Sequence, residues 1–105
     1  MKVFLDDERV PPEGWVLVRW PSEAIELLKK HEVQEISLDH DLGNDEIGTG
    51  YDVILWLEEQ VAIFNFLPPV ITIHSANTSA RRKMLAGVEN IYKLARENQS
   101  QNFKE

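Results

Sequence analysis

Short apolar runs alternate with longer amphipathic segments along this chain. The runs at residues 3–5, 36–38 and 70–73 are largely apolar over the length of a short strand, as in buried strands of a sheet. Residues 15–20 alternate bulky and β-branched residues and predict a fourth strand. Because helical segments separate most of these runs, the pattern favours a mostly parallel sheet with helices on both faces.

Apolar residues at helical spacing predict three helices. The first opens at Pro21 and Ser22, with Ser22 as its N-cap, and ends at about His31. The second covers about residues 51–63, and the third begins near Thr78.

One connection does not fit this scheme. The loop at residues 8–14 is polar, contains Pro11 and Pro12, and is short for a parallel crossover, which usually takes a dozen residues or more. Either the connection is unusually tight, or the strand that follows it lies antiparallel or detached.

The composition sets the broad class. The chain has 105 residues, of which 43% are hydrophobic and 28% charged, and this fits one domain with one core. We place that domain at residues 1–97 and expect residues 98–105 to form a polar, frayed tail. Cysteine is absent, which excludes disulfides, thiolate metal sites and cysteine nucleophiles.

The net charge of −7 argues against broad, sequence-independent binding to duplex DNA. Residues 1–60 hold five basic and fifteen acidic residues, whereas residues 61–105 hold six basic and three acidic ones. An acidic half that holds a metal could therefore face a basic region that meets an anion, and a protein partner stays open. Without a visible signal peptide or an apolar stretch of roughly 20 residues, we expect a cytoplasmic protein and no membrane contact.

Two acidic clusters follow predicted strands. Asp6 and Asp7 follow the first strand, and Asp39 and Asp41 follow the run at 36–38, so all four would emerge at the carboxyl edge of a parallel sheet. Four carboxylates at one edge repel one another unless they are protonated or neutralised, and Mg²⁺ prefers such oxygen ligands. The clusters therefore predict a metal site.

Not every acid in these clusters is expected to bind the ion directly. Asp6 and Asp7 point to opposite sides of their strand, so one of them would act through water, and adjacent acids also occur as ordinary surface residues. Asp41 has an alternative role in the turn before Gly43, which leaves Asp39 as the safer ligand of that cluster.

Two histidines end strands at the same edge. His40 and His74 are candidate catalytic residues, one as general acid and the other as general base. A histidine at a strand end is also a common hydrogen-bonded structural residue, so both interpretations stay open. His31, which follows two lysines at a helix end, fits an interaction with the helix dipole instead.

The start of the last predicted helix indicates a phosphate site. Three cations at residues 81–83 oppose the helix dipole, and an anionic ligand would offset that repulsion. Ser75, Asn77 and Arg81 are therefore candidate phosphate ligands, as is Arg9 in the loop after the first acids. Helix capping by Ser75 and Asn77 and plain solvent exposure of the arginines are the alternatives.

The segments VFLDD, ISLDHDLG, GTGYDVILWL and PPVITIHSA together resemble the receiver domain of bacterial response regulators, over about residues 2–76. The resemblance implies an α/β fold: a small, truncated flavodoxin-like or receiver-like three-layer sandwich with a mostly parallel four-stranded sheet. It also implies that Asp6, Asp7 and Asp39 hold Mg²⁺ for phosphoryl transfer.

The chain departs from the receiver pattern at three points. A proline-containing loop replaces the helix that normally follows the first strand, His74 stands in place of the receiver's Ser or Thr, and the fifth strand with its lysine is missing. The segments LDDERVPP, DHDLG and HSAN are similar to the cyclic-phosphate processing receiver-like family. That similarity implies action on cyclic phosphate ends or on nucleotides.

The leading hypothesis is a Mg²⁺- or Mn²⁺-dependent phosphoesterase that acts on an RNA 2′,3′-cyclic phosphate end or a cyclic nucleotide. Asp39 would be either a metal ligand or the nucleophile that attacks phosphorus. The alternative is a catalytically inactive signalling or cyclic-nucleotide-binding module. A conventional phospho-acceptor domain is the least favoured option, because the receiver lysine is missing.

Overall fold

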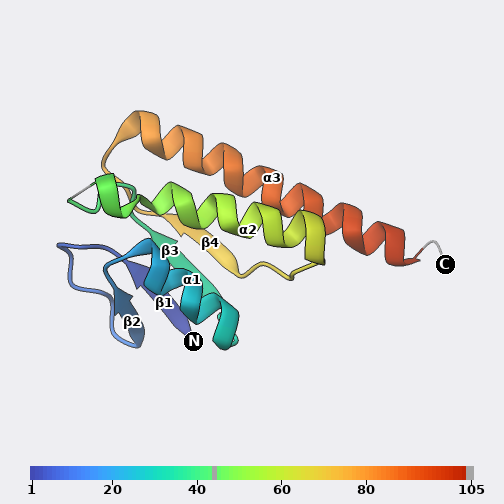
Figure 1. Cartoon of the computed structure of the whole chain (residues 1–105), viewed down its shortest axis with the longest axis horizontal. Helices are drawn as coiled ribbons and strands as arrows, with labels where there is room; N and C mark the ends of the chain where they lie inside the picture. The colour runs from blue at the N-terminus through green and yellow to red at the C-terminus, as the bar shows by residue number, and fades with distance from the viewer. Residues whose placement is uncertain (44, 104–105) are drawn as a thin grey trace.

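The computed structural model describes residues 1–43 and 45–103, which form four strands and three α-helices (Figure 1). The elements are, in chain order, β1 (Lys2–Leu5), β2 (Trp15–Val18), α1 (Pro21–Lys30), β3 (Glu35–Leu38), the 3-10 turn η1 (Asp45–Ile47), α2 (Gly50–Phe64), β4 (Val70–Ile73) and α3 (Thr78–Phe103). All four predicted strands and all three predicted helices are present, although several of their ends differ. No helix in the described part of the chain is both long and apolar enough to cross a bilayer.

The four strands form one parallel sheet in the order β2-β1-β3-β4. Strand β2 pairs in parallel with β1, so that Trp15 lies opposite Lys2 and Val18 opposite Leu5. The loop between β1 and β2 is therefore an unusually tight parallel connection, and β2 is neither antiparallel nor detached. Gly14 closes this loop with φ +86°, a left-handed conformation that glycine adopts without strain.

The helices pack against one face of the sheet (Figure 1). The two crossovers that contain a helix run from β2 to β3 and from β3 to β4, in the same direction along the sheet. Right-handed crossovers in one direction place their helices on the same face, and α3 packs beside α2. The core takes from β1, β3 and β4 only the alternate residues that face the helices, which are Val3, Leu5, Ile36, Leu38, Ile71 and Ile73.

The predicted receiver-like α/β sandwich with a four-stranded parallel sheet is confirmed. The second helical layer, however, is not found in the described residues, because the loop that follows β1 contains no helix to cover the other face. The sheet covers part of that face with its own side chains. Phe4 is 7% exposed, since the rings of Trp15 and His74 pack against it.

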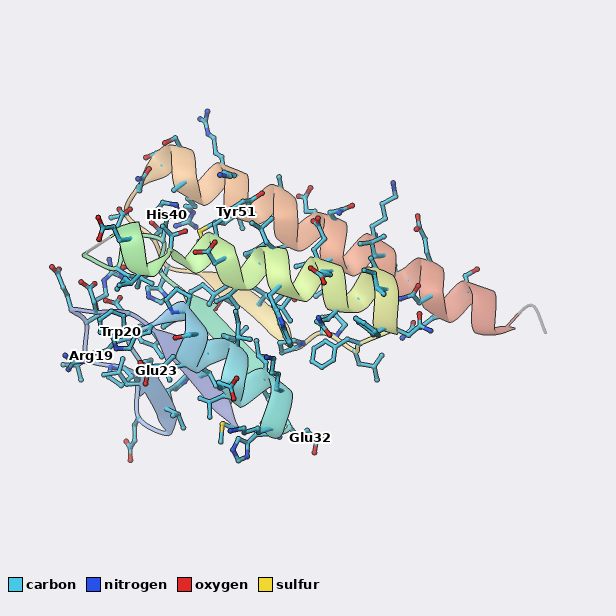
Figure 2. All side chains as sticks on the ribbon, viewed as in Figure 1. Arg19, Trp20, Glu23, Glu32, His40 and Tyr51 are labelled. Atoms are coloured by element: carbon cyan, nitrogen blue, oxygen red, sulfur yellow. The ribbon has the colours of Figure 1, made fainter. Side chains whose placement is uncertain are left out.

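Helix α1 begins earlier than its predicted cap. Trp20 occupies the N-cap position and Pro21 the first turn, so Ser22 lies inside the helix and does not cap it. Proline fixes φ near the helical value and needs no N–H partner at this position. The carboxylate of Glu23 accepts the backbone N–H of Arg19 at 3.3 Å, and Figure 2 shows both side chains near the junction of β2 with α1.

Helix α3 continues to Phe103, past residue 98, where we expected a polar tail to begin. The side-chain amide of Asn98 donates to the carbonyl oxygen of Val61 at 2.8 Å, which ties this part of α3 to α2. A polar residue of the segment that we expected to fray thus makes a tertiary contact with α2. Residues 104–105 of the predicted tail lie outside the described residues.

Candidate metal and phosphate site

Asp6, Asp39 and His74 occupy equivalent positions at the carboxyl ends of three neighbouring strands. Each follows the last residue of its strand, and those last residues are in register across β1, β3 and β4. The sheet hydrogen bonds continue through them, because the N–H of Asp39 donates to the carbonyl of Leu5 and that of His74 to the carbonyl of Leu38, both at 3.0 Å. Equivalent positions on parallel strands point to the same side, which here is the face without helices.

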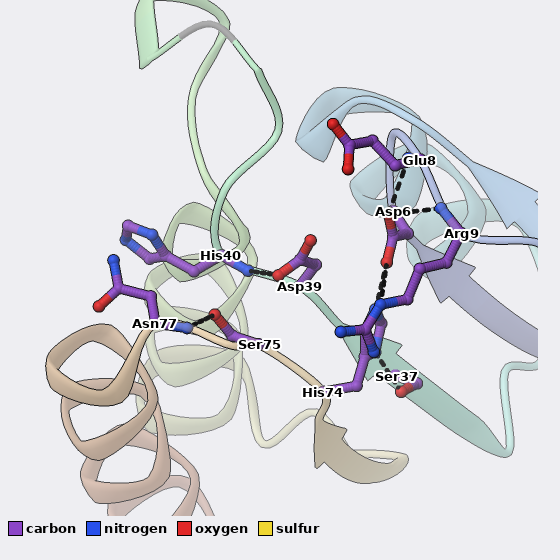
Figure 3. Close-up of polar contacts among 9 residues, drawn as sticks. All are labelled: Asp6, Glu8, Arg9, Ser37, Asp39, His40, His74, Ser75 and Asn77. Atoms are coloured by element: carbon purple, nitrogen blue, oxygen red, sulfur yellow. Dashed lines mark hydrogen bonds and ion pairs between the residues drawn. The ribbon is translucent and has the colours of Figure 1, made fainter.

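The three side chains converge. His74 Nε2 lies 3.0 Å from Asp6 Oδ2 (Figure 3). One oxygen each from Asp6 and Asp39 and one ring nitrogen of His74 all lie within 4.8 Å of one another. Asp6 is only 1% exposed, and the other two residues are half-buried. Among the described residues, this cluster has the spacing of groups that share one metal ion.

The imidazole of His74 reaches Asp6 by crossing β3, which lies between their strands. Its Nδ1 lies 2.7 Å from the hydroxyl of Ser37 in β3, and its ring stacks on Phe4 of β1 with the centroids 4.3 Å apart. These two contacts fix the plane of the ring and the direction of Nε2. Sequence reasoning missed both partners, although a polar residue inside the apolar run ISL was an available signal for Ser37.

The turn after β1 wraps around the carboxylate of Asp6. Oδ1 accepts the backbone N–H of Glu8 at 2.8 Å and that of Arg9 at 3.0 Å. Burial raises the pKa of Asp6, but these two hydrogen bonds, together with His74, outweigh burial, so the pKa is lowered. The fold therefore keeps Asp6 as an anion in a buried position.

Asp39 has the opposite electrostatic balance. Burial raises its pKa, and the charges of Asp6 and Asp41 add to the rise. The N–H of His40, which donates to Asp39 Oδ1 at 2.8 Å, and the nearby His74 offset only part of it. The charge crowding predicted from the sequence is thus present at Asp39, and a cation would relieve it.

Helix α2 starts directly against the backbone of Asp39. A Cβ at Gly50 would lie 1.8 Å from the carbonyl oxygen of Asp39, so this contact requires glycine. Thr49 caps the helix: its hydroxyl accepts the N–H of Tyr51 at 3.2 Å, and its own N–H donates to the carboxylate of Asp52 at 2.8 Å. The segment GTGYD therefore fixes the position of Asp39 through close backbone packing.

A pocket of about 280 Å³ opens beside the cluster. Asp7 and Asp41, the other two predicted metal ligands, line this pocket together with Asp6 and Asp39. Neither belongs to the group of ligand atoms that lie within 4.8 Å of one another. Asp41 instead pairs with His40, whose Nδ1 lies 2.8 Å from its Oδ1. The structure therefore brings Asp7 and Asp41 to the pocket but not into the inner cluster.

The two predicted catalytic histidines point to different places. Figure 3 shows the ring of His40 on the side of Asn77 and away from Asp6, whereas the ring of His74 lies at the cluster. The contact of His40 with the cluster is made by its backbone N–H to Asp39. A role of the His40 side chain in proton transfer stays a prediction.

Ser75 and Asn77, two of the predicted phosphate ligands, make capping contacts at the start of α3. Asn77 Oδ1 accepts the N–H of Ala80 at 3.1 Å, and the N–H of Asn77 donates to Ser75 Oγ at 3.2 Å. Arg81 is exposed on the first turn, and its backbone N–H donates to the carbonyl of Asn77. The capping alternative accounts for these contacts, and phosphate binding by the three residues stays a prediction.

Arg9 is the predicted phosphate ligand that lines the pocket. Its Nε lies 3.9 Å from Asp6 Oδ2, and 55% of its side chain is exposed. At this distance the ion pair is loose, so the guanidinium retains donors that can meet a phosphate oxygen.

The residues present fit a divalent cation. Carboxylate oxygens and an imidazole nitrogen are ordinary metal ligands, and the raised pKa of Asp39 shows that its environment disfavours the charge that a cation would balance. The backbone hydrogen bonds to Asp6 and the capped start of α2 behind Asp39 hold two of the three groups in place.

The parallel sheet, the acidic carboxyl edge and the glycine-rich start of α2 define a receiver-like α/β domain. Residues 1–90 match the sequence model of the cyclic-phosphate processing receiver domain, and the chain belongs to this family. No curated protein and no solved structure matches the chain significantly. The matched range contains every residue of the cluster and of the pocket beside it.

Proposed function

We propose that the chain is a metal-dependent phosphoesterase that opens a cyclic phosphate, at an RNA 2′,3′-cyclic end or in a cyclic nucleotide. The observation that carries the proposal is the convergence of Asp6, Asp39 and His74 beside a pocket that Arg9 also lines. Membership of the cyclic-phosphate processing receiver family supports the class of substrate. The cation would be Mg²⁺ or Mn²⁺, held first of all by Asp6 and Asp39.

The reaction needs few groups from the protein. A bound cation would polarise the phosphoryl oxygens and lower the pKa of a water molecule. Arg9 would donate to phosphate oxygens and so orient the ring for attack. The water oxygen forms a bond to phosphorus, one P–O ester bond breaks, and the released ribose oxygen takes up a proton. The product is a phosphomonoester.

Asp39 has two candidate roles in this reaction. As a metal ligand it stays unmodified. As a nucleophile, its carboxylate would bond to phosphorus and displace one of the two ribose oxygens. The other ester bond would remain, so the nucleotide would be joined to Asp39 through an acyl phosphodiester that water then hydrolyses. Mass spectrometry of the protein, quenched during turnover, distinguishes the two roles by the presence or absence of a nucleotide adduct on Asp39.

Binding without turnover is the second candidate function, and the direction of the His40 ring favours it. With His40 turned away from the cluster and Ser75 and Asn77 engaged in capping, fewer side chains are placed to move protons at the pocket. A domain with such a site would sequester a cyclic nucleotide as a signalling module.

The test is an assay of 2′,3′-cyclic AMP, 3′,5′-cyclic AMP and an oligoribonucleotide with a cyclic phosphate end, each with Mg²⁺ or Mn²⁺. We expect Asp6→Asn and Asp39→Asn to lower turnover at least about tenfold, because each removes a ligand charge. His31→Ala, which changes an exposed histidine beyond α1, is the matched control. Undiminished turnover in Asp39→Asn contradicts the proposal, and tight binding with no product over hours supports the module.

A further inference from the structure

We propose that His74 is itself a metal ligand and that the site therefore selects a first-row transition-metal ion over Mg²⁺. The use of the ion in catalysis rests on the proposed function, but the binding of the ion can be measured alone. The acidic clusters in the sequence predict an all-oxygen site. The structure instead offers two carboxylates and one imidazole nitrogen, from Asp6, Asp39 and His74.

The geometry of the cluster is set by the sheet. Each of the three residues is the first after its strand, at the same register, and its backbone N–H continues the sheet hydrogen bonds. Ligand atoms within 4.8 Å of one another on such a frame can meet one ion through side-chain adjustments alone. Asp7 and Asp41 line the pocket beside the cluster and are not among its three members.

The ring of His74 is held in the manner of a metal-binding histidine. Such a histidine almost always uses its second ring nitrogen in a hydrogen bond that fixes the ring. Here the hydroxyl of Ser37 lies 2.7 Å from Nδ1, and this leaves Nε2 directed at Asp6. Phe4 stacks on the ring with an interplanar angle of 5°, so rotation out of this plane would lose the stacking contact.

The hydroxyl of Ser37 suits His74 with and without an ion, because a hydroxyl both donates and accepts. Without the ion, Nε2–H of His74 can donate to Asp6 Oδ2, and the Ser37 hydroxyl can meet Nδ1 as donor or as acceptor. With an ion bound, Nε2 would be the ligand atom and Nδ1–H would donate to the Ser37 oxygen. Ser37 therefore acts as a positioning residue for the ring.

The donor types decide which ion is preferred. Mg²⁺ demands oxygen ligands and keeps several waters, whereas imidazole suits first-row ions such as Fe²⁺, Ni²⁺ and Zn²⁺. Mn²⁺ begins this first-row series and binds N/O sites the least tightly of its members, so a preference for Mn²⁺ over Mg²⁺ is a demanding test of the imidazole ligand. A site that needs His74 as its third ligand therefore penalises Mg²⁺. A site made of Asp6 and Asp39 alone, with His74 only hydrogen-bonded to Asp6, would not distinguish the two ions in this way.

The experiment uses the full chain and Mn²⁺ as the probe, without substrate. Electron paramagnetic resonance measures free and bound Mn²⁺, Mg²⁺ is added as a competitor, and pulsed measurements detect a ¹⁴N nucleus bonded to Mn²⁺. We expect Mn²⁺ to bind at least about tenfold more tightly than Mg²⁺ and to show the ¹⁴N signal. His74→Ala should abolish that signal, and Ser37→Ala should weaken Mn²⁺ binding by about 10- to 100-fold.

Two control variants and a check of the fold complete the test. His31→Ala should keep both the affinity and the ¹⁴N signal, and Ser37→Thr, which retains the hydroxyl, should recover much of the affinity lost in Ser37→Ala. Circular dichroism checks the fold of each variant, and the ¹⁴N signal of the unmodified protein tests the ligand without any variant. Absence of that signal, no binding at millimolar Mn²⁺, or equal competition by Mg²⁺ overturns the proposal. A full ¹⁴N signal without turnover overturns the proposed phosphoesterase and leaves this inference standing.

Discussion

The Nε2 atom of His74 lies 3.0 Å from the Oδ2 atom of Asp6, although 68 positions separate the two residues in the sequence. The imidazole extends from the end of β4, passes Ser37 in β3, and reaches the end of β1. That path is open because the helices pack on the other face of the sheet. The loop that stands in place of a helix after β1 therefore leaves the space in which a histidine joins the carboxylates.

Asp39→Asn is expected to raise the melting temperature of the metal-free protein by a few degrees at neutral pH. The pKa of Asp39 is raised, chiefly by burial, so the folded state holds this proton more tightly than the unfolded chain. The stability that Asp39 contributes is present below its ordinary pKa and is lost as the pH rises through the raised value. An asparagine removes that loss and can still accept the N–H of His40.

The measurement is thermal unfolding of both proteins at about pH 3 and about pH 7, on either side of the titration of a raised aspartate. The difference between the two melting temperatures should be clear at the higher pH and small at the lower one. Saturating Mn²⁺ should reverse the order, because only the unmodified protein has the full ligand set. An equal difference at both pH values would show that charge is not its cause.

Register explains why the sequence placed Asp6, Asp39 and His74 at one edge of the sheet. Asp6, Asp39 and His74 each follow a short apolar run. Parallel strands bring their carboxyl ends to one edge of the sheet, independently of the structure of the segments that connect them. The side chains of His40 and Asp41 lie further into a loop, where their direction depends on turns and hydrogen bonds that no periodicity records. Their predicted roles therefore could not be placed from the sequence.

The one-sided sheet also escaped sequence reasoning. Strand β1 is apolar at Val3, Phe4 and Leu5, which is the pattern of a strand covered on both faces. Phe4 is indeed buried, but by Trp15 of the edge strand β2 and by His74 of the candidate site, not by a helix. An apolar residue reports burial and not the identity of its neighbours, so the second layer of helices was wrongly expected.

Gly50→Ala is expected to destabilise the fold by about 3 kcal/mol or more, because the new Cβ would overlap backbone atoms that cannot turn aside. It would lie 1.8 Å from the carbonyl oxygen of Asp39 and 2.8 Å from its carbonyl carbon. The variant that still folds should also bind Mn²⁺ more weakly, since Asp39 must shift. Urea denaturation and Mn²⁺ titration measure the two effects.

Gly14→Ala is the matched control for that substitution. Gly14 has φ +86°, but a Cβ there meets no atom within 4 Å, so the change carries backbone strain without a clash. Its cost should stay near 1–2 kcal/mol, and Mn²⁺ affinity should not change. If Gly50→Ala and Gly14→Ala destabilise the fold equally, the close contact between the start of α2 and the backbone of Asp39 is not what makes Gly50 necessary.

Tyr92→Phe is expected to cost about 1–2 kcal/mol of stability, because it leaves a backbone donor of an edge strand without its partner. The hydroxyl of Tyr92 accepts the N–H of Ile71 in β4 at 2.8 Å and donates to the carbonyl of Pro69 at 3.3 Å. The urea midpoint should fall with an unchanged m-value, and the amide of Ile71 should exchange faster with deuterium. If the urea midpoint does not change and the Ile71 amide stays protected from exchange, the N–H of Ile71 must have an acceptor other than Tyr92.

Arg9→Gln tests whether the guanidinium binds the phosphate of the substrate. The backbone N–H of Arg9, which holds Asp6, is retained in this variant, so the turn after β1 should stay in place. The side chain is more than half exposed, so its loss should raise KM by about fivefold, the equivalent of about 1 kcal/mol, with a smaller change in kcat. Mn²⁺ affinity should not fall, because the substitution removes a positive charge near Asp6 and removes no metal ligand.

Arg9→Lys is the matched control. It keeps the charge but not the planar pair of donors, so its KM should lie between those of the unmodified protein and Arg9→Gln. A loss of kcat at constant KM, or weaker Mn²⁺ binding, would instead give Arg9 a role in holding Asp6 and the ion.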